Sequence, residues 1–394
     1  MRNHRGQAPP QVQSTLAKLS LCRTPALGGH RYRCSSCAHE TTVHNSCGDR
    51  HCPQCGGAKR RNWLDSTARL LVPGVDYYQV VFTIPDQLSS LALGNRRRMF
   101  DLLFHSAWRA LKQTVEHEQR FEAAAAMVLH TWNQKLDAHI HVHALVPGGG
   151  PSLDHAGAWQ AARPPACERQ NRFWLVNADD LRAAFRAKFL VGLRRLQANE
   201  ELKLDGEWEL LRDEAAFDEW LEPLESIDWV TFIQPPPSPN SPPENVLKYL
   251  ARYMTGGPIS DRRLVSYENG SVTFSARVGT TTGGSDETED VELPAVEFVR
   301  RWSLHILPKG FTKTRRFGGF SNHHAKRYLT DCHALLSVKR GPVVTPSDAN
   351  ANGDDKSHRC PECGAGMYCV ASSRSPGWRD VMSSVHRPWW YKDG

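Results

Sequence analysis

An alternating run of histidines and apolar residues, residues 139–150, is the most informative stretch of this chain. Alternate side chains of a β-strand share one face, so His139, His141 and His143 lie on one side and the residues between them are buried on the other. Imidazoles that converge in this way form a metal site. The alternative is a half-buried strand that carries histidines on its exposed face. The third histidine in phase and the three glycines that end the run favour the metal site.

A second strand is predicted just before this run. Residues 127–132 are mostly apolar and residues 133–138 are polar enough to turn, which predicts a hairpin. If Trp132 pairs with His139, then His130 faces the middle histidine of the run on the same side of the hairpin. A slip by one residue would turn His130 away. The predicted metal site has three ligands and a fourth histidine at its rim: His130, His141, His143 and His139.

The chain contains 11 cysteines, and several of them form pairs separated by two residues, as zinc ligands do. Two such pairs lie in the first 65 residues, which are poor in apolar periodicity. Thiolate ligation would hold together a region that lacks the apolar content to fold alone. The spacing of the two pairs predicts one structural tetrahedral zinc site, with the ligands Cys34, Cys37, Cys52 and Cys55.

Further cysteines and histidines suggest additional zinc sites. Four residues interleave with the first two pairs and form either a second, cross-braced site or ordinary packing and hydrogen-bonding positions: Cys22, His30, Cys47 and His51. Near the carboxyl end, Cys360 and Cys363 form half of a zinc ribbon. The sequence leaves the other half open between Cys332, His333, His358 and Cys369.

Length and composition bound the class of protein. At 394 residues the chain is long enough for two or three domains with cores of their own. It has no run of about 18 apolar residues, and its amino terminus lacks the apolar stretch of a signal peptide. Because the cysteines occur in ligand-like pairs, we expect a reducing compartment and a soluble, intracellular protein.

The formal net charge of +7 is concentrated in short basic clusters, as expected of a surface that follows phosphates. Together with the 12 tryptophans, these clusters make nucleic acid the favoured partner. Residues 309–317 alternate basic with aromatic or hydroxyl residues, which is compatible with a strand lying along single-stranded DNA or with an edge strand protected by charge. The predicted DNA-binding residues are Lys248, Arg252, Lys309, Lys313, Arg315 and Arg316.

The order of predicted elements indicates an α+β fold. A β-branched and aromatic strand over residues 77–84 precedes a long helix over residues 88–120, and the two histidine strands follow. Strand, helix, strand, strand is the opening of a ferredoxin-like or RNA-recognition-type sandwich with a central antiparallel sheet. A helix near residues 179–199, a strand at 228–234, a hairpin at 264–278, an acidic loop at 285–290 and a helix at 294–307 come next.

A proline-rich linker, residues 235–243, leads to a short predicted helix over residues 245–254. Tyr249 and Tyr253 are four residues apart, so their side chains lie on one helix face, one turn from each other. Two tyrosines so placed are usually aromatic packing. The basic residues Lys248 and Arg252 beside them, and the glycine pair that ends the helix, favour a role with a phosphate-bearing substrate.

Taken in order, these motifs resemble those of the HUH endonucleases and, more narrowly, of rolling-circle insertion-sequence transposases of the IS91 type. The resemblance covers nearly the whole chain, although Ile140 stands where the family often has proline. The motifs are Cys22-Arg23-Thr24, Gly29-His30, Cys34-x-x-Cys37, Ser46-Cys47, Arg50-His51-Cys52-Pro53-x-Cys55, His130-Thr131-Trp132, His141-Val142-His143, the three glycines from Gly148, Tyr249-Leu250-Ala251-Arg252-Tyr253, Pro258-Ile259-Ser260 and Leu307-Pro308-Lys309-Gly310-Phe311.

The resemblance implies a DNA transposase that cleaves and rejoins single-stranded DNA at transposon ends and targets. One tyrosine attacks a phosphodiester to give a 5′-phosphotyrosine and a free 3′-hydroxyl, and the other permits a second transfer. The histidines hold a divalent ion, Mg²⁺ or Mn²⁺, and the cysteines hold structural Zn²⁺. The implied domains are a zinc-binding DNA-recognition domain (1–66), a paired-tyrosine nuclease domain with insertions (74–328) and a tail with a partial zinc ribbon (329–394). The implied location is the bacterial cytoplasm, in association with the nucleoid.

Two other classes of protein remain open on the sequence. A non-catalytic, zinc-dependent DNA-binding or replication-accessory protein would close the site with all four histidines, whereas an enzyme would keep an open position beside Tyr249. A zinc-dependent hydrolase would use metal-bound water as its nucleophile. It has no obvious general base near the histidines, and it leaves the paired tyrosines without a role.

Overall fold

A computed structural model describes residues 9–163, 175–234, 236, 257–278, 287–337, 358–378 and 381. The chain divides into two compact units, which are described separately. Unit 1 comprises Met1–Asn62, Gly256–Ile306 and Thr345–Gly394. Unit 2 comprises Trp63–Thr255 and Leu307–Val344. Because residues from both ends of the chain meet in unit 1, this division differs from the predicted ranges 1–66, 74–328 and 329–394.

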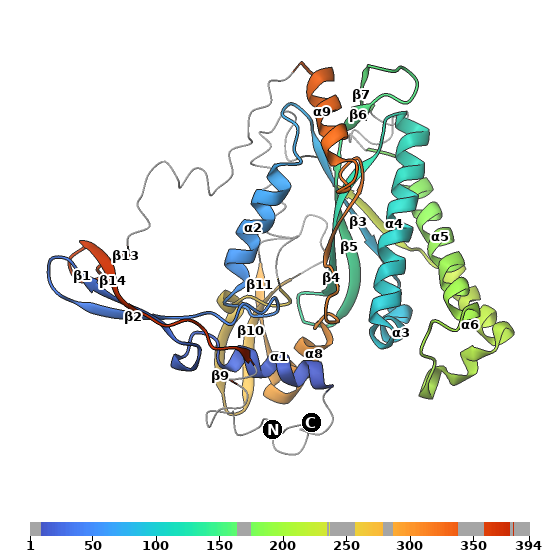
Figure 1. Cartoon of the computed structure of the whole chain (residues 1–394). Helices are drawn as coiled ribbons and strands as arrows, with labels where there is room; N and C mark the ends of the chain where they lie inside the picture. The colour runs from blue at the N-terminus through green and yellow to red at the C-terminus, as the bar shows by residue number, and fades with distance from the viewer. Residues whose placement is uncertain are drawn as a thin grey trace. The chain divides into compact units, whose positions relative to one another are not determined.

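A five-stranded antiparallel sheet forms the centre of unit 2, in the order β12-β4-β5-β3-β8 (Figure 1). The central β5 lies between β4 and β3, which a long helix connects, so β3–α4–β4–β5–α5–β8 is a split β-α-β arrangement of the ferredoxin-like kind. The predicted α+β class is confirmed. The strands are β3 (Tyr77–Thr83), β4 (Ala124–Trp132), β5 (Ala138–Pro147), β8 (Val230–Gln234) and β12 (Thr314–Gly318).

One face of this sheet is covered by the antiparallel pair α4 (Arg96–Gln119) and α5 (Ala178–Ala198), as Figure 1 shows. The buried residues of α4 recur every three or four positions, which gives the helix one apolar stripe toward the sheet. Phe82 of β3 packs edge-on against Phe185 of α5, with ring centroids 5.1 Å apart. Asn177 begins α5, because its side-chain oxygen accepts a hydrogen bond from the backbone N–H of Asp179.

The long helix predicted over residues 88–120 is two helices, α3 (Ser89–Gly94) and α4. Asn95 separates the two helices. Its side chain exchanges hydrogen bonds with the backbone of Lys203, and its own backbone departs from helical geometry. The other elements in the described part of unit 2 are the 3-10 helices η3 (Asp86–Leu88) and η4 (Gly206–Arg212), the strands β6 (Gly149–Pro151) and β7 (Trp159–Ala161), and the helices α6 (Glu214–Ser226) and α9 (Ala325–Leu335). The boundary between the two units falls within α2 (Gly56–Ala68).

The β4–β5 hairpin has the predicted pairing at its centre. His130 lies directly opposite His141, which confirms the register expected from the sequence. Trp132 pairs with Ala138 and not with His139, because an irregularity between residues 130 and 132 shifts the register by one. The shift falls beyond the histidine pair, so it leaves the shared face of the ligands unchanged.

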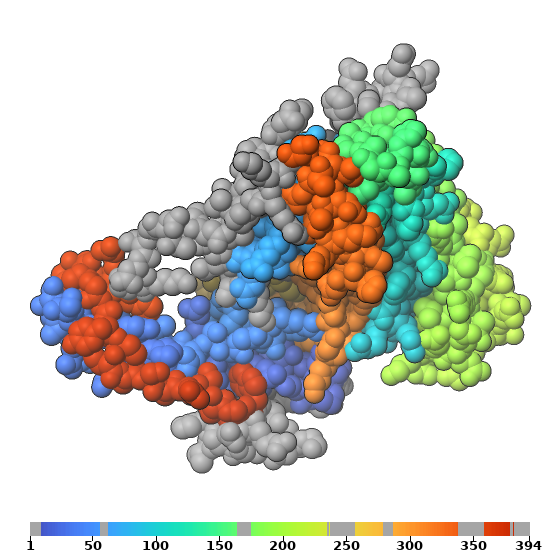
Figure 2. Space-filling view, turned by 45° about the horizontal axis from the view of Figure 1, so that its top comes forward, coloured from blue at the N-terminus to red at the C-terminus, as the bar shows by residue number. Residues whose placement is uncertain are grey.

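The glycine run after β5 is closely packed. Gly149 and Gly150 are buried in the short β6 strand, which pairs with β7. A Cβ atom on Gly150 would lie 2.8 Å from the backbone oxygen of Glu122 and 3.1 Å from the hydroxyl of Tyr328. Helix α9, which carries Tyr328, lies beside β6 in the orange and green surfaces of Figure 2. The glycines therefore permit a close approach that no side chain would allow.

Unit 1 contains two small sheets. One has the order β13-β14-β1-β2 and pairs an amino-terminal strand with a carboxyl-terminal one. The other, β11-β10-β9, confirms the hairpin predicted over residues 264–278, and its third strand includes residues 288–290, which were predicted as loop. The elements are α1 (Pro10–Ser20), η2 (Pro25–Leu27), β1 (Gly29–Cys34), β2 (Glu40–His44), η5 (Asp261–Arg263), β9 (Leu264–Glu268), β10 (Ser271–Arg277), β11 (Thr288–Pro294), α8 (Ala295–Leu304), β13 (His358–Arg359) and β14 (Gly366–Ser372).

Within the described part of the chain, no helix has both the length and the hydropathy that a membrane span requires.

We expect Gly150→Ala to lower the stability of the protein by about 1–3 kcal/mol, because the new methyl group meets a backbone oxygen and a rigid ring. Gly94→Ala is the matched control: Gly94 is exposed, ends α3 and has no atom within 4 Å of an added Cβ. Thermal unfolding followed by circular dichroism measures both. Equal melting temperatures for the two variants would contradict the packing role of Gly150.

Candidate functional site

Three histidines converge on the face of the central sheet opposite α4 and α5. His130 lies on β4, and His141 and His143 lie on β5; all three are buried, and one nitrogen from each lies within 4.8 Å of the others. The Nε2 atoms of His141 and His143 are 3.1 Å apart. Two ligands about 2.1 Å from one ion and at right angles to each other are separated by roughly 3.0 Å. The spacing therefore fits two nitrogens that bind one metal ion.

The hydrogen bonds of the two β5 imidazoles bear on which nitrogens face the cluster. The Nδ1 atom of His141 lies 2.9 Å from the backbone oxygen of His139. A carbonyl oxygen only accepts, so Nδ1 carries the proton and the lone pair of Nε2 faces the cluster. The Nδ1 atom of His143 lies 3.0 Å from the side-chain amide nitrogen of Gln79 on β3. The side-chain oxygen of Gln79 is buried without a hydrogen-bond partner.

Burial keeps these imidazoles neutral. It lowers the pKa of His143 to about 3, with smaller contributions from Lys313 and His139, and it lowers the pKa of His141 well below its usual value. A neutral imidazole has the lone pair that a metal needs, whereas an imidazolium has none. At neutral pH His141 and His143 are therefore uncharged, as metal ligation requires, and the position of the proton on each ring decides which nitrogen can bind.

Other residues surround the cluster without joining it. The ring of His139 lies 4.9 Å from that of His141, at the rim as predicted, and its nitrogens are not part of the three-residue group. Trp132 stacks on His130 with centroids 4.7 Å apart, and the Lys313 ammonium lies 4.8 Å from the centre of the Trp132 ring. Three protein ligands leave coordination positions for a further group, unlike a closed four-ligand site.

Among the residues that the structure describes, eight cysteines form two groups of four, in a combination that the sequence did not predict. The expected site of Cys34, Cys37, Cys52 and Cys55 does not form, because its two pairs belong to different groups. The first group consists of Cys22, Cys47, Cys52 and Cys55. The second consists of Cys34, Cys37, Cys360 and Cys363. The carboxyl-terminal pair is therefore completed by the pair at the end of β1. None of the residues expected in that place, Cys332, His333, His358 and Cys369, belongs to the group.

The first group is compact and buried. Its sulfur atoms lie 3.5 Å apart between Cys22 and Cys55 and 3.7 Å apart between Cys47 and Cys55. The backbone N–H of Cys47 donates to the sulfur of Cys22, a bond that favours the thiolate form. The two histidines expected here are held elsewhere: His30 contacts the Ser372 hydroxyl at 3.0 Å and His51 contacts Asp49 at 2.9 Å.

Comparison with known proteins identifies the family of the chain. Residues 125–327, more than half of the chain, match the family described as "Putative transposase", and residues 1–84 match the "Transposase zinc-binding domain". The chain belongs to the IS91-type transposases. The matches make this transposase a DNA-processing enzyme with structural Zn²⁺.

Two relatives match along most of their length. A protein of Sinorhizobium fredii named "Putative transposase y4qJ" is 33% identical over 365 residues, which cover 89% of this chain and 87% of that protein. The "Transposase for insertion sequence element IS801" of Pseudomonas savastanoi pv. phaseolicola is 28% identical over 374 residues, which cover 91% of this chain and 83% of that protein.

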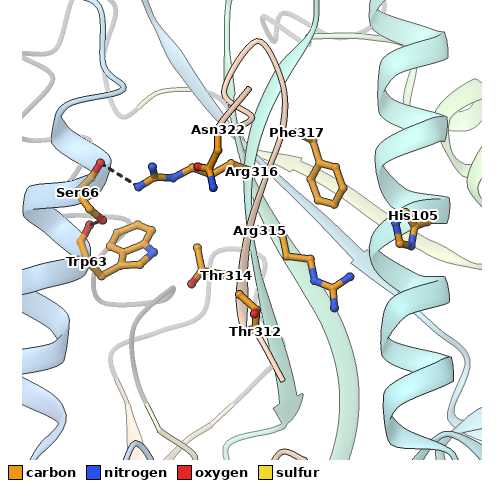
Figure 3. A pocket seen from close by; sticks show the side chains of 9 residues that line it. All are labelled: Trp63, Ser66, His105, Thr312, Thr314, Arg315, Arg316, Phe317 and Asn322. Atoms are coloured by element: carbon orange, nitrogen blue, oxygen red, sulfur yellow. Dashed lines mark hydrogen bonds between the residues drawn. The ribbon is translucent and has the colours of Figure 1, made fainter. Parts of the chain in front are cut away.

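A cavity of about 580 Å³ lies along β12 in unit 2 of this transposase (Figure 3). Trp63 and Ser66 of α2 line one side, and the Arg316 guanidinium donates a hydrogen bond to the backbone oxygen of Ser66 at 3.1 Å. The full lining is Trp63, Ser66, His105, Thr312, Thr314, Arg315, Arg316, Phe317 and Asn322.

The residues predicted to bind DNA have different surroundings. Arg315 pairs with Asp101 of α4 and lies over the rings of Phe104 and Phe311, so its charge is engaged in the fold. Lys309 is exposed, and Lys313 lies beside Trp132 at the histidine cluster. The remaining predicted residues of this set, Lys248 and Arg252, and the paired tyrosines Tyr249 and Tyr253 lie outside the described residues.

We expect the double variant Cys52→Ser, Cys55→Ser to contain one zinc ion fewer per chain than the unaltered protein, because it removes half of a tetrathiolate site. Elemental analysis after dialysis measures the zinc content. Cys369→Ser, which changes an exposed cysteine outside both groups, is the control and should keep the full content. An unchanged zinc content in the double variant would exclude the first group as a zinc site.

Proposed function

We propose that this transposase cleaves and rejoins single-stranded DNA at insertion-sequence ends through a 5′-phosphotyrosine, as in rolling-circle transposition. The observation that carries the proposal is the open group of three buried imidazoles, His130, His141 and His143, beside the cation of Lys313. A closed site of four histidines, expected of a non-catalytic DNA-binding protein, has no support, because His139 stands outside the group.

The proposed reaction conserves the number of phosphoester bonds. The phenolate oxygen of Tyr249 or Tyr253 attacks the scissile phosphorus and forms a phosphotyrosine bond, while the bond from phosphorus to the 3′ oxygen breaks. The leaving oxygen takes a proton and becomes a 3′-hydroxyl. The reverse attack by a 3′-hydroxyl rejoins a strand and releases the tyrosine. One ester replaces another at each step, so no nucleotide cofactor is required.

His130, His141 and His143 would hold the divalent ion, Mg²⁺ or Mn²⁺, that polarises and orients a non-bridging oxygen of the scissile phosphate. The positive charge of Lys313 contributes to the lowered pKa of His143 and His141. Its field therefore also reaches the position proposed for the scissile phosphate. An ammonium beside the site attracts the anionic backbone. Imidazole ligands by themselves favour Mn²⁺ over Mg²⁺.

The cavity along β12 supplies a path for the strand. Thr314 pairs with Val128, which lies two residues from His130 on β4, so Thr314 and the histidine cluster share one face of the sheet. Trp63 offers an aromatic ring and Arg316 a guanidinium in the same cavity. Aromatic faces and cations in one groove suit an unpaired strand, whose bases stack while its phosphates contact the charges.

Gln79 sets the proton position on His143 in this proposal. When the Gln79 amide presents its oxygen, it accepts a hydrogen bond from Nδ1–H of His143 and leaves the lone pair on Nε2 for the ion. When it presents its nitrogen, Nδ1 must accept and Nε2 holds the proton, which blocks ligation. A half-turn of the amide exchanges the two states, because oxygen and nitrogen occupy equivalent positions.

The reaction is tested with labelled single-stranded DNA that contains the element's end, incubated with Mn²⁺ or Mg²⁺ and resolved on a denaturing gel. We expect a covalent protein–DNA adduct, which Tyr249→Phe, Tyr253→Phe abolishes because both attacking oxygens are lost. His141→Ala and His143→Ala should each abolish it as well, whereas His139→Ala, at the rim, should keep it. Mass spectrometry locates the adduct, and a 5′-phosphate attached to any other residue would exclude the mechanism.

The role of Gln79 is tested by metal affinity. We expect Gln79→Leu to weaken Mn²⁺ binding by about 10–100-fold, since a ligand histidine loses its orienting acceptor. Gln79→Glu restores an acceptor and should restore affinity. Isothermal titration calorimetry measures both variants, with melting temperatures as the control for folding. Wild-type affinity in the leucine variant would show that Gln79 is only a packing residue.

A further inference from the structure

Two strands from opposite ends of the chain lie side by side in unit 1. β1 pairs antiparallel with β14 from Cys34↔Met367 to His30↔Ser372, and Figures 1 and 2 show the blue and red segments in contact. Each strand adjoins a Cys-x-x-Cys pair: Cys34 and Cys37 at the end of β1, Cys360 and Cys363 just before β14. The pairing brings the two pairs of thiols together, although Cys34 and Cys363 are 329 residues apart in the sequence.

The four sulfur atoms have the spacing of a metal tetrathiolate. Cys34 and Cys363 are 3.4 Å apart and Cys37 and Cys360 are 3.6 Å apart, with all four sulfurs within 4.8 Å of one another. Tetrahedral zinc with bonds of about 2.3 Å places its sulfurs roughly 3.8 Å apart. The distances exceed a disulfide bond, and the four cysteines are free.

The first turn has the N–H···S hydrogen bonds of a zinc knuckle, and the second turn is closed by backbone hydrogen bonds. In the first turn, the backbone N–H groups of Ser36 and Cys37 donate to the sulfur of Cys34 at 3.3 and 3.5 Å. In the second, the N–H of Cys360 donates to the Ala365 oxygen, and Gly364 has a φ of +72°, which closes the turn. N–H donors stabilise a thiolate, so the backbone is arranged for charged sulfur.

The local apolar core is too small to explain the sheet. Its buried members are Cys34, Cys360 and Met367, and the partly buried Tyr32 and Ala365 complete it. Most residues of β2 and β14 are exposed, and the residues of β1 other than Cys34 are exposed or only partly buried. A four-stranded sheet with so little apolar burial needs another source of stability, and a metal centre supplies it in small modules of this kind.

We propose that Cys34, Cys37, Cys360 and Cys363 bind one structural Zn²⁺ that joins the two ends of the chain in a single zinc ribbon. The carboxyl-terminal pair lies outside the zinc-binding domain matched over residues 1–84, so this site is additional to the group of Cys22, Cys47, Cys52 and Cys55. The ribbon is a closed site of four soft ligands, which suits zinc and has no position for a substrate. The segment 358–372 is then an integral part of the amino-terminal module.

Thiol protection tests the proposal on the unaltered full-length protein. Cys37, Cys363 and Cys369 are all exposed, so free thiols at the three positions would react at similar rates. With zinc bound, Cys37 and Cys363 should be alkylated at least about tenfold more slowly than Cys369, because a coordinated thiolate is a poor nucleophile. A chelator should then unmask Cys34, Cys37, Cys360 and Cys363 together. Equal reactivity of Cys37, Cys363 and Cys369 before chelation would overturn the proposal.

Zinc content provides a second, independent measurement. The double variants Cys34→Ser, Cys37→Ser and Cys360→Ser, Cys363→Ser should each lose one zinc ion per chain, and the combined quadruple variant should lose no more than either. Cys369→Ser, on the same strand as the ribbon, is the matched control and should lose none. Additive losses or full zinc content in either double variant would overturn the shared site, and iron in place of zinc would overturn the assignment of the metal. None of these readouts depends on DNA cleavage.

Discussion

The pairing of His130 with His141 across the β4–β5 hairpin is the interaction on which the candidate site depends. It holds because apolar side chains occupy the opposite face of the same strands: Leu129, Ile140 and Val142 are buried in the core that includes residues of α4 and α5. A slip of one residue would expose those side chains and bury the histidines among them, which costs far more than any single contact of the site. The packing that stabilises the sheet thus also fixes the positions of the imidazole ligands.

That packing also sets the charge state of the imidazoles of His141 and His143. Burial removes their charge, and two lone pairs 3.1 Å apart repel each other unless a proton or a cation lies between them. The carbonyl of His139 directs one lone pair inward, and Gln79 controls the other. In the proposed enzyme, a half-turn of the Gln79 amide therefore converts a hydrogen-bonded histidine pair into a pair of metal ligands. The ion does not have to assemble the site, because the strands already hold its ligands in place.

The sequence predicted features set by local periodicity and missed those set by distant pairing. The alternation of residue types predicted that His141 and His143 share a face, and the length of the hairpin predicted that His130 lies opposite His141. The order of strands and helices predicted the ferredoxin-like sheet. Gln79 was missed because it is 64 residues from His143 and reaches it only through the order β5-β3. The cysteines were assigned to the wrong partners because Cys-x-x-Cys pairs are alike in sequence, and the β1–β14 pairing decides which of them meet.

Ligand number separates the two kinds of site within one chain. Each cysteine group offers four sulfurs, which satisfy a tetrahedral ion and leave no place for a phosphate, so such a site can only stabilise. The histidine group offers three nitrogens, which in the proposed enzyme would hold an ion and leave room for a substrate oxygen. Sulfur also prefers zinc, whereas imidazoles accept exchangeable ions such as Mn²⁺. On this reasoning the chain can retain its structural zinc while a different ion enters and leaves the proposed cleavage site, because neither ligand set suits the other's role.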